Sequence, residues 1–308
     1  MVVGEFSLTT IQLAPTMPWL RFTLRTDTQH ADNVSDALEQ AGAQAITLID
    51  AQDQPLFEPL PGETPLWAEL EITGLFAADI DTSVLDRQLT TQLSAEIMAS
   101  RRLEPLEDKD WSRVWMDDYH PMQFGKNVWI VPSWCEPPQA DAVNILLDPG
   151  LAFGTGTHPT TSLCLQWLDG QDLTNKHVLD YGCGSGILAI AAAKLGAKKI
   201  TAIDIDPQAL QATQDNATRN GVNHLISTHL PIDLPDAGFD MLLANILAGP
   251  LAELADMLCK ALRPGANLVL SGILAEQADN VASAYRRHCD IGEPTQQGDW
   301  IRLSGTRL

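Results

Sequence analysis

Three glycines follow an apolar stretch in VLDYGCGSG, residues 178–186. Because an apolar helical pattern begins directly after Gly182, Gly184 and Gly186, we expect a buried strand, a turn and a helix in that order. Glycine adopts backbone dihedrals that other residues avoid, and it lets a ligand approach the main chain closely. Ligands of doubly wound α/β sheets bind at the carboxyl ends of strands. The turn is therefore a candidate binding site.

The spacing of this turn and its acidic neighbours indicate which ligand it holds. A dinucleotide fingerprint reads GxGxxG, but Ile187 stands three positions after Gly184, so the spacing is GxGxG. A pyrophosphate prefers an uncluttered helix N-terminus, whereas Asp180, just before the turn, suits a cationic ligand. Asp204 ends the next predicted strand, 22 residues after Gly182, where a carboxylate can accept hydrogen bonds from ribose hydroxyls. The combination favours S-adenosylmethionine over a nicotinamide cofactor, and a glycine turn without a ligand is the alternative.

A second candidate is the segment LLDPGLAFGTGTHPTT, residues 146–161. Its density of proline, glycine and threonine predicts a loop that leads into a helix beginning near Thr160 and Thr161. Free backbone N–H groups and a partial positive charge at that point would suit the carboxylate of S-adenosylmethionine, although ordinary helix capping explains the threonines equally well. His158 could act as a general base, but a structural, hydrogen-bonded role fits its place before Pro159 as well.

A third candidate is LLANILAGP, residues 242–250. Asn245 follows a strongly apolar strand, so we expect its amide at the carboxyl edge of the sheet, beside the glycine turn. Its carbonyl can accept hydrogen bonds from a substrate amino group and orient the nitrogen lone pair toward a methyl carbon. Asparagine is also a common strand-ending turn residue, and only the coincidence with the other two motifs favours the catalytic interpretation.

Two different patterns of elements surround these motifs. From about residue 170 onward, apolar strands over 176–182, 199–206, 238–247 and 267–274 alternate with helices, which predicts a parallel sheet covered on both faces. The first part predicts the order β-α-β-β-α-β of a ferredoxin-like unit, with strands at 19–26, 45–51, 66–76 and 101–106 and helices at 31–43 and 82–100. Residues 107–141 concentrate tryptophan and proline with few basic groups, so they indicate an aromatic connector rather than a base-stacking platform.

The net charge and composition of the chain limit the kinds of molecule that it is expected to bind. The 308 residues carry 19 basic and 40 acidic groups, a net charge of −21, and residues 1–100 hold 3 basic against 15 acidic groups. Such a field repels nucleic acid and attracts a basic protein, although a solubilising surface is the simpler explanation. No apolar run is long enough for a membrane span, and no secretory signal is evident. Five widely spaced cysteines without a CxxC pair predict buried free thiols, no structural metal site and a cytoplasmic location.

The three motifs, together with WSRVWMDDYHPMQFG in the connector, resemble the ribosomal protein L11 methyltransferase family over about 17–308. The resemblance implies a ferredoxin-like substrate-recognition domain (17–106), a linker (107–145) and a Rossmann-like, doubly wound class I methyltransferase domain (146–308). It implies methylation of the N-terminal α-amine and lysine ε-amines of a basic large-subunit ribosomal protein that the acidic first domain recognises. Carried over by motif, the cofactor contacts are Thr161, Gly182, Gly184, Asp204 and Asn245, with Asn245 as the catalytic residue. Tyr181 stands where phenylalanine or leucine is expected, which should not alter the cofactor.

A mechanism without a side-chain base follows from this assignment. Only a neutral amine can attack the methyl carbon, and desolvation beside a sulfonium lowers the pKa of an ammonium. The alternatives are a methyltransferase for another protein amine or amide nitrogen, a binding module without catalysis, and a nicotinamide-dependent oxidoreductase. Asn245 is followed by Ile246 rather than by the Pro-Pro-aromatic run typical of glutamine and adenine methyltransferases, so a flipped base is not expected.

Overall fold

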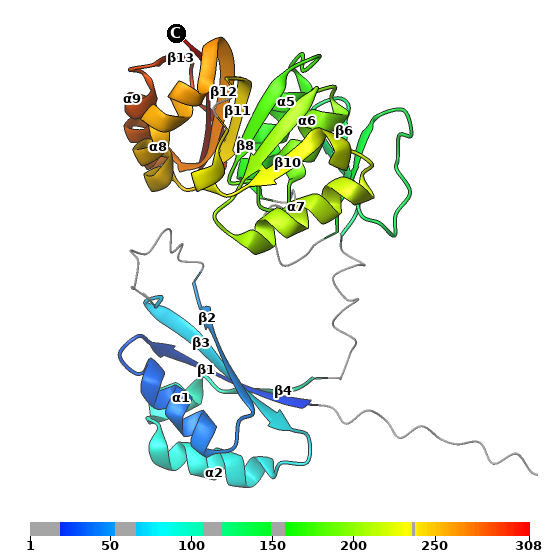
Figure 1. Ribbon diagram of the computed structural model, residues 1–308. Coiled ribbons are helices and arrows are strands. Elements are labelled where there is room, and N and C mark those ends of the chain that lie inside the picture. The colour runs from blue at the N-terminus through cyan, green and yellow to red at the C-terminus, as the bar shows by residue number, and fades with distance from the viewer. Residues whose placement is uncertain (1–18, 53–65, 107–118, 149–157, 236–237) are drawn as a thin grey trace, which may run out of the picture. The chain divides into compact units, whose positions relative to one another are not determined.

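The computed structural model describes residues 19–52, 66–106, 119–148, 158–235 and 238–308 (Figure 1). The chain divides into two compact units, Met1–Val114 and Trp115–Leu308. No helix in these described ranges is long and apolar enough to cross a membrane.

The first unit is a four-stranded antiparallel sheet with helices against one face (Figure 1). The strands lie in the order β2-β3-β1-β4, which confirms the predicted ferredoxin-like arrangement. Side chains of α1, α2 and α3 and alternate residues of β1 and β3, such as Phe22, Leu24 and Ile72, form one buried core. The elements are β1 (Trp19–Asp27), α1 (Ala31–Gln40), β2 (Ala45–Asp50), β3 (Glu69–Ala77), α2 (Thr82–Gln92), α3 (Ala95–Ala99) and β4 (Arg102–Leu106).

The prediction of a single helix over 82–100 is wrong in one respect, because two helices, α2 and α3, occupy this range. Leu93 is extended, with φ −111° and ψ 154°, so α2 ends before it. Ser94 then caps the new helix, its side chain accepting a hydrogen bond from Ile97 N. A serine with a glutamate two residues later is a start signal inside an otherwise helical pattern.

The second unit is built on a mixed sheet in the order β10-β9-β8-β11-β12-β15-β13, with β14 paired to β15. Strands β10 to β12 are parallel, whereas β15, β13 and β14 pair in antiparallel fashion. The expectation of a wholly parallel sheet is therefore wrong at its C-terminal edge. The strands are β8 (His177–Tyr181), β9 (Lys199–Ile203), β10 (Ile226–His229), β11 (Phe239–Asn245), β12 (Leu262–Leu274), β13 (Cys289–Ile291), β14 (Thr295–Gln297) and β15 (Trp300–Arg307).

Both faces of this sheet are covered, which confirms the doubly wound α/β fold. Along β8, Val178 lies in the core cluster shared with α5, α6 and α7, and Leu179 lies in the cluster shared with α8 and α9. Strands buried on both faces explain why their sequences are nearly all apolar. The helices are α5 (Pro159–Asp169), α6 (Ile187–Lys194), α7 (Pro207–Arg219), α8 (Ala248–Ala261) and α9 (Ala278–Tyr285).

The predicted linker, 107–145, is partly folded. Its residues 107–118 lie outside the described ranges, but β5 (Met122–Phe124), β6 (Val128–Val131) and β7 (Val143–Leu146) form a small sheet that belongs to the second unit. Ile130 and Ile145 of this sheet are buried in the same core cluster as α5 and α6. This core therefore extends into a segment whose tryptophans and prolines do not reveal its strands.

Asp169, at the end of α5, fastens this small sheet to the rest of the unit. Its two carboxylate oxygens accept hydrogen bonds from Lys126 N (2.6 Å) and Asn127 N (3.1 Å) in the β5–β6 turn. Because Asp169→Ala leaves both donors without this partner, we expect the free energy of unfolding to fall by about 1–3 kcal/mol. Urea denaturation measures it, with Asp141→Ala, at an exposed aspartate in the turn before β7, as a control. Equal stability of the two variants would show that the turn is not anchored in this way.

Candidate functional site

The glycine turn between β8 and α6 is held by its main chain. Gly182, Gly184 and Gly186 have φ values of 79°, 54° and 80°, in the left-handed region that favours glycine. The N–H groups of Gly182 and Cys183 both donate to Ile203 O, at 2.7 and 2.9 Å, so the end of β9 fixes the start of the turn. A side chain at Gly182 would also collide with the side chain of Ile246. Any larger residue there would distort the turn itself.

Asp204, which follows β9, contacts the same turn. Its Oδ2 accepts a hydrogen bond from Gly184 N at 2.9 Å, and its Oδ1 accepts one from Asp206 N at 3.0 Å. The structure thus brings together two residues that were predicted as cofactor contacts from motifs 20 residues apart. Each oxygen keeps a further lone pair that a ligand hydroxyl can use.

Two polar side chains of α7, which sequence reasoning missed, donate hydrogen bonds to carbonyl groups of the glycine turn. Thr213, fully buried, donates from Oγ1 to Gly184 O at 3.0 Å, and Asn216 donates from Nδ2 to Ser185 O at 2.9 Å. A side chain at Gly186 would meet Thr213. The available signal was a polar residue in line with Ala209 and Ala217 on the buried face of the helix.

Asp180 lies under the turn with only 1% of its surface exposed. Its Oδ2 accepts a hydrogen bond from Ala189 N, in the first turn of α6, at 2.9 Å. Its Oδ1 has no hydrogen-bond partner within the described residues. Burial, with a contribution from the nearby Asp204 carboxylate, raises the pKa of Asp180 to about 7. A cationic group placed near this carboxyl would favour its ionised form.

Asn245 and Thr161 meet, although their motifs are 84 residues apart. Asn245, the last residue of β11, donates from Nδ2 to Oγ1 of the buried Thr161 in α5, at 3.3 Å. This contact decides which way the amide points. No described residue donates to Asn245 Oδ1, so that carbonyl oxygen can accept a further hydrogen bond.

The start of α5 does not offer the free N–H groups that were expected there. The side chain of His158 accepts from Thr160 N, and Thr161 N donates to His158 O at 3.1 Å. The ring of His158 also makes an edge contact with Trp300, their centroids 4.8 Å apart. Burial lowers the pKa of His158. In the structure His158 caps this helix, as the capping interpretation expects, and carboxylate docking at Thr160 and Thr161 stays a prediction.

The pairs Gly184–Asp204 and Thr161–Asn245 lie at one edge of the sheet. Strand β8 pairs with β9 on one side and with β11 on the other, so the carboxyl ends of the three strands are neighbours. Large apolar side chains are exposed directly after two of these ends, Ile205 after β9 (81% exposed) and Leu247 after β11 (51%). Sequence reasoning missed them. Exposed apolar side chains beside hydrogen-bonding groups are typical of ligand sites. Residues 149–157, the rest of the second motif, lie outside the described residues.

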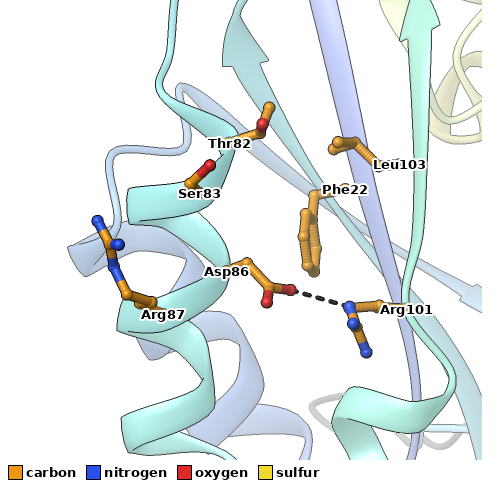
Figure 2. Close-up of a pocket in the computed structure, with 7 residues that line it drawn as sticks. All are labelled: Phe22, Thr82, Ser83, Asp86, Arg87, Arg101 and Leu103. Carbon is orange, nitrogen blue, oxygen red and sulfur yellow. Dashed lines mark ion pairs between the residues drawn. The ribbon is translucent and has the colours of Figure 1, made fainter.

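The first unit contains a different feature, a cavity of about 570 Å³ (Figure 2). Figure 2 shows the carboxylate of Asp86, on α2, facing the guanidinium of Arg101, and the two form a 2.8 Å ion pair. The lining residues are Phe22, Thr82, Ser83, Asp86, Arg87, Arg101 and Leu103. None belongs to a predicted motif. Over the described parts of both units, no group of three or more histidine, cysteine, aspartate or glutamate residues could hold a metal ion.

The raised pKa of Asp180 makes stability depend on pH. Because the folded chain holds this proton more tightly than the unfolded chain, the stabilisation is complete below the ordinary value of 3.8 and is lost as the pH rises toward about 7. Asp180→Asn cannot titrate. We expect the free energy of unfolding of the wild type, relative to this variant, to fall by about 1–3 kcal/mol between about pH 5 and pH 7.5. Urea titrations at both pH values measure it, and a constant difference would contradict the buried, protonated carboxyl.

The chain is similar to known proteins along nearly its whole length. The profile of the family described as ribosomal protein L11 methyltransferase (PrmA) matches residues 18–308. A ribosomal protein L11 methyltransferase from Shewanella sediminis is 53% identical over 292 residues, covering 94% of this chain and 100% of that protein. One from Pseudomonas aeruginosa is 53% identical over 292 residues, covering 94% of this chain and 99% of that protein.

Among solved structures, a ribosomal protein L11 methylase from Lactobacillus delbrueckii subsp. bulgaricus is similar to this chain at 37% sequence identity with a TM-score of 0.57. The match covers 61% of this chain and 99% of that one. With the family profile spanning nearly the whole sequence, and relatives above half identity over almost their full length, the chain belongs to the ribosomal protein L11 methyltransferase family.

Proposed function

We propose that this protein transfers methyl groups from S-adenosylmethionine to amino groups of a large-subunit ribosomal protein, at its N-terminal α-amine and at lysine ε-amines. The observation that carries the proposal is the meeting of the Thr161–Asn245 pair and the Gly184–Asp204 pair at one sheet edge, in a member of this family. The site residues are those expected from the motifs: Thr161, Gly182, Gly184, Asp204 and Asn245.

The residues at this edge fit S-adenosylmethionine. Asp204 ends the strand beside the glycine turn, where its remaining lone pairs suit ribose hydroxyls, and the exposed side chain of Ile205 can pack against a purine. The unpartnered Oδ1 of Asp180 and the absence of described basic residues among these contacts suit a ligand that carries positive charge. A pyrophosphate would instead meet two carboxyl groups.

Positioning of the amine is the chemistry that the protein supplies. When bound, S-adenosylmethionine provides an electrophilic methyl group on a sulfonium centre. Asn245 Oδ1, held in place by the bond from its Nδ2 to Thr161, accepts a hydrogen bond from the substrate N–H and so orients the nitrogen lone pair. The amine must be neutral, and burial of the substrate nitrogen lowers its pKa. No described side chain at this edge is needed as a proton acceptor.

The charge of the first unit supports a basic partner. On the open face of its sheet, Arg25 and Arg102 both pair with Glu71, and Arg21 pairs with Glu104. The face is thus largely neutralised by its own ion pairs. The helical side differs, because α1 carries exposed acidic residues without a basic residue in its last turn. We infer that this side attracts the positively charged ribosomal protein, and that nucleic acid is not the specific partner.

The location that fits this function is the cytoplasm, where ribosomal proteins are made. All five cysteines are free thiols, in keeping with a reducing compartment.

A methyltransferase for another protein amine or amide nitrogen is the alternative. The two are separated by incubating the purified protein with methyl-labelled S-adenosylmethionine and either ribosomal protein L11 or a ribosome-depleted extract. We expect label in L11, at the N-terminus and lysines. Label only in other proteins would favour the alternative, and no uptake of S-adenosylmethionine at millimolar concentration would overturn both.

Replacing Asn245 tests whether it orients the substrate amine rather than binding S-adenosylmethionine. Because Asn245→Ala removes the carbonyl that orients the amine, we expect kcat to fall about 10²-fold or more, while the Kd for S-adenosylmethionine changes only a few-fold. Steady-state kinetics and calorimetry measure the two quantities. Thr161→Val is the matched variant: it keeps the Asn245 carbonyl but removes the hydroxyl that holds it, so its loss of kcat should be smaller. Unchanged turnover in Asn245→Ala would exclude the catalytic role.

Neutralising the exposed acidic residues of α1 tests the recognition surface. We expect the KM for the ribosomal protein to rise about 3–10-fold and to depend less on salt, with the Kd for S-adenosylmethionine unchanged, because electrostatic attraction acts mainly on encounter. The substitutions are Asp32→Asn, Asp36→Asn and Glu39→Gln.

A matched control removes three exposed charges from the second unit. The substitutions are Glu253→Gln, Glu276→Gln and Asp279→Asn. If the control raises KM as much as the α1 variant, recognition follows overall charge rather than the helical side of the first unit.

A further inference from the structure

Two cysteines lie against each other in the second unit, far from the motifs of the proposed site. Cys259, near the end of α8, and Cys289, at the start of β13, have Sγ atoms 3.4 Å apart, and both side chains are buried. Both are free thiols. The sequence alone predicts buried free thiols and no pair, because these two positions are 30 apart in the chain and no CxxC spacing connects them.

Contacts that do not involve sulfur hold the pair together. Cys289 pairs with Arg307 across the β13–β15 ladder. The guanidinium of Arg307 donates from Nε to Cys259 O at 3.1 Å and from Nη1 to His288 O at 2.6 Å. A 2.7 Å ion pair joins His288 Nε2 to Asp256 of α8. The end of α8 and the start of β13 are therefore joined by three bonds, so the approach of the two sulfurs does not depend on one rotamer.

The surroundings distinguish the two thiols. The hydrogen bond between the two sulfurs, with the positive charge of Arg307, lowers the pKa of Cys289, whereas that same bond and burial raise the pKa of Cys259. The thiolate is the nucleophilic form of cysteine. Cys289 is buried but lies on the edge strand β13, whose outer side pairs with no described strand.

We propose that Cys259 and Cys289 are a redox-active pair that a hydroperoxide oxidises to an intramolecular disulfide. In the first step the Cys289 thiolate attacks hydrogen peroxide: an S–O bond forms, the O–O bond breaks, and hydroxide leaves and takes the thiol proton as water. In the second step the Cys259 sulfur displaces hydroxide from the Cys289 sulfenic acid, and that hydroxide leaves as water with the Cys259 proton. Two thiols are oxidised, and one peroxide is reduced to two waters. A dithiol reductant reverses the product.

The pair is independent of the proposed methyl transfer. Asn245 precedes the start of α8, whereas Cys259 lies close to the end of the helix. The sulfurs must close from 3.4 Å to about 2.05 Å, which needs a small movement of one side chain. The bond would then connect two segments of the chain that unfolding separates, so it should raise Tm by a few degrees.

Peroxide treatment of the purified full-length protein tests the proposal. We expect thiol titration in denaturant to fall from five groups to three, and non-reducing peptide mapping to find Cys259 linked to Cys289. Dithiothreitol should restore all five thiols. Cys259→Ser and Cys289→Ser should abolish the cross-link, whereas Cys135→Ser, the matched control at a more exposed cysteine, should form it at the wild-type rate.

The wild-type peptide map keeps the test valid even if a serine variant folds poorly. Oxidation confined to Cys135, cross-links between chains, or sulfinic acid at Cys289 without a disulfide would each overturn the proposal. The proposal is also overturned if the wild-type protein keeps all five thiols after peroxide treatment and Cys135→Ser is oxidised no faster than the wild type.

Discussion

The site depends on how a segment of glycines is held in one conformation. Gly182, Gly184 and Gly186 have no side chains with which to fix themselves, and all three adopt φ values that other residues avoid. Their neighbours fix them instead: the end of β9 through Ile203 O, the carboxylate of Asp204, and the hydroxyl of Thr213. Glycines let a ligand approach the backbone, but they leave the turn flexible. Hydrogen bonds from residues outside the turn are therefore needed to hold it in one conformation.

The order of the strands brings the glycine turn together with the other candidate site residues. Because β9, β8 and β11 are adjacent and parallel, Asp204, the glycine turn and Asn245 leave the sheet at the same edge. Helix α5 adds Thr161, whose hydroxyl orients the Asn245 amide. Each contact joins residues that are distant in sequence, so the fold, and not any single motif, makes the arrangement. The collision that a side chain at Gly182 would make with Ile246 shows how closely these segments are packed.

Residues at the ends of buried strands could be predicted from the sequence. Residues and strands whose role depends on a contact with a distant part of the chain could not. Asp204 and Asn245 stand at the ends of short apolar runs that alternate with helical patterns, so the residue pattern places them at the sheet edge. Thr213 and Asn216 of α7 read as ordinary polar residues until the turn lies against them. Strands β13 and β14 have three residues each, too few to carry a periodic signal, and only their pairing with β15 defines them. The small sheet within the predicted linker was missed for the same reason, whereas the break before Ser94 carries a local capping signal that the helical periodicity over 82–100 conceals.

The electrostatics of the site explain why a carboxyl group is buried in this core at all. Asp180 is almost fully buried, and its raised pKa means that ionising it costs the ligand-free fold stability. One oxygen is satisfied by Ala189 N of α6, but the other has no partner in the described chain. An apolar residue of similar size would avoid that cost, so packing alone does not account for the aspartate. A positively charged ligand beside the turn offsets the cost, because its field favours the ionised carboxyl. A buried carboxyl that costs the fold stability when ionised is therefore better suited to a cationic ligand than to an anionic one.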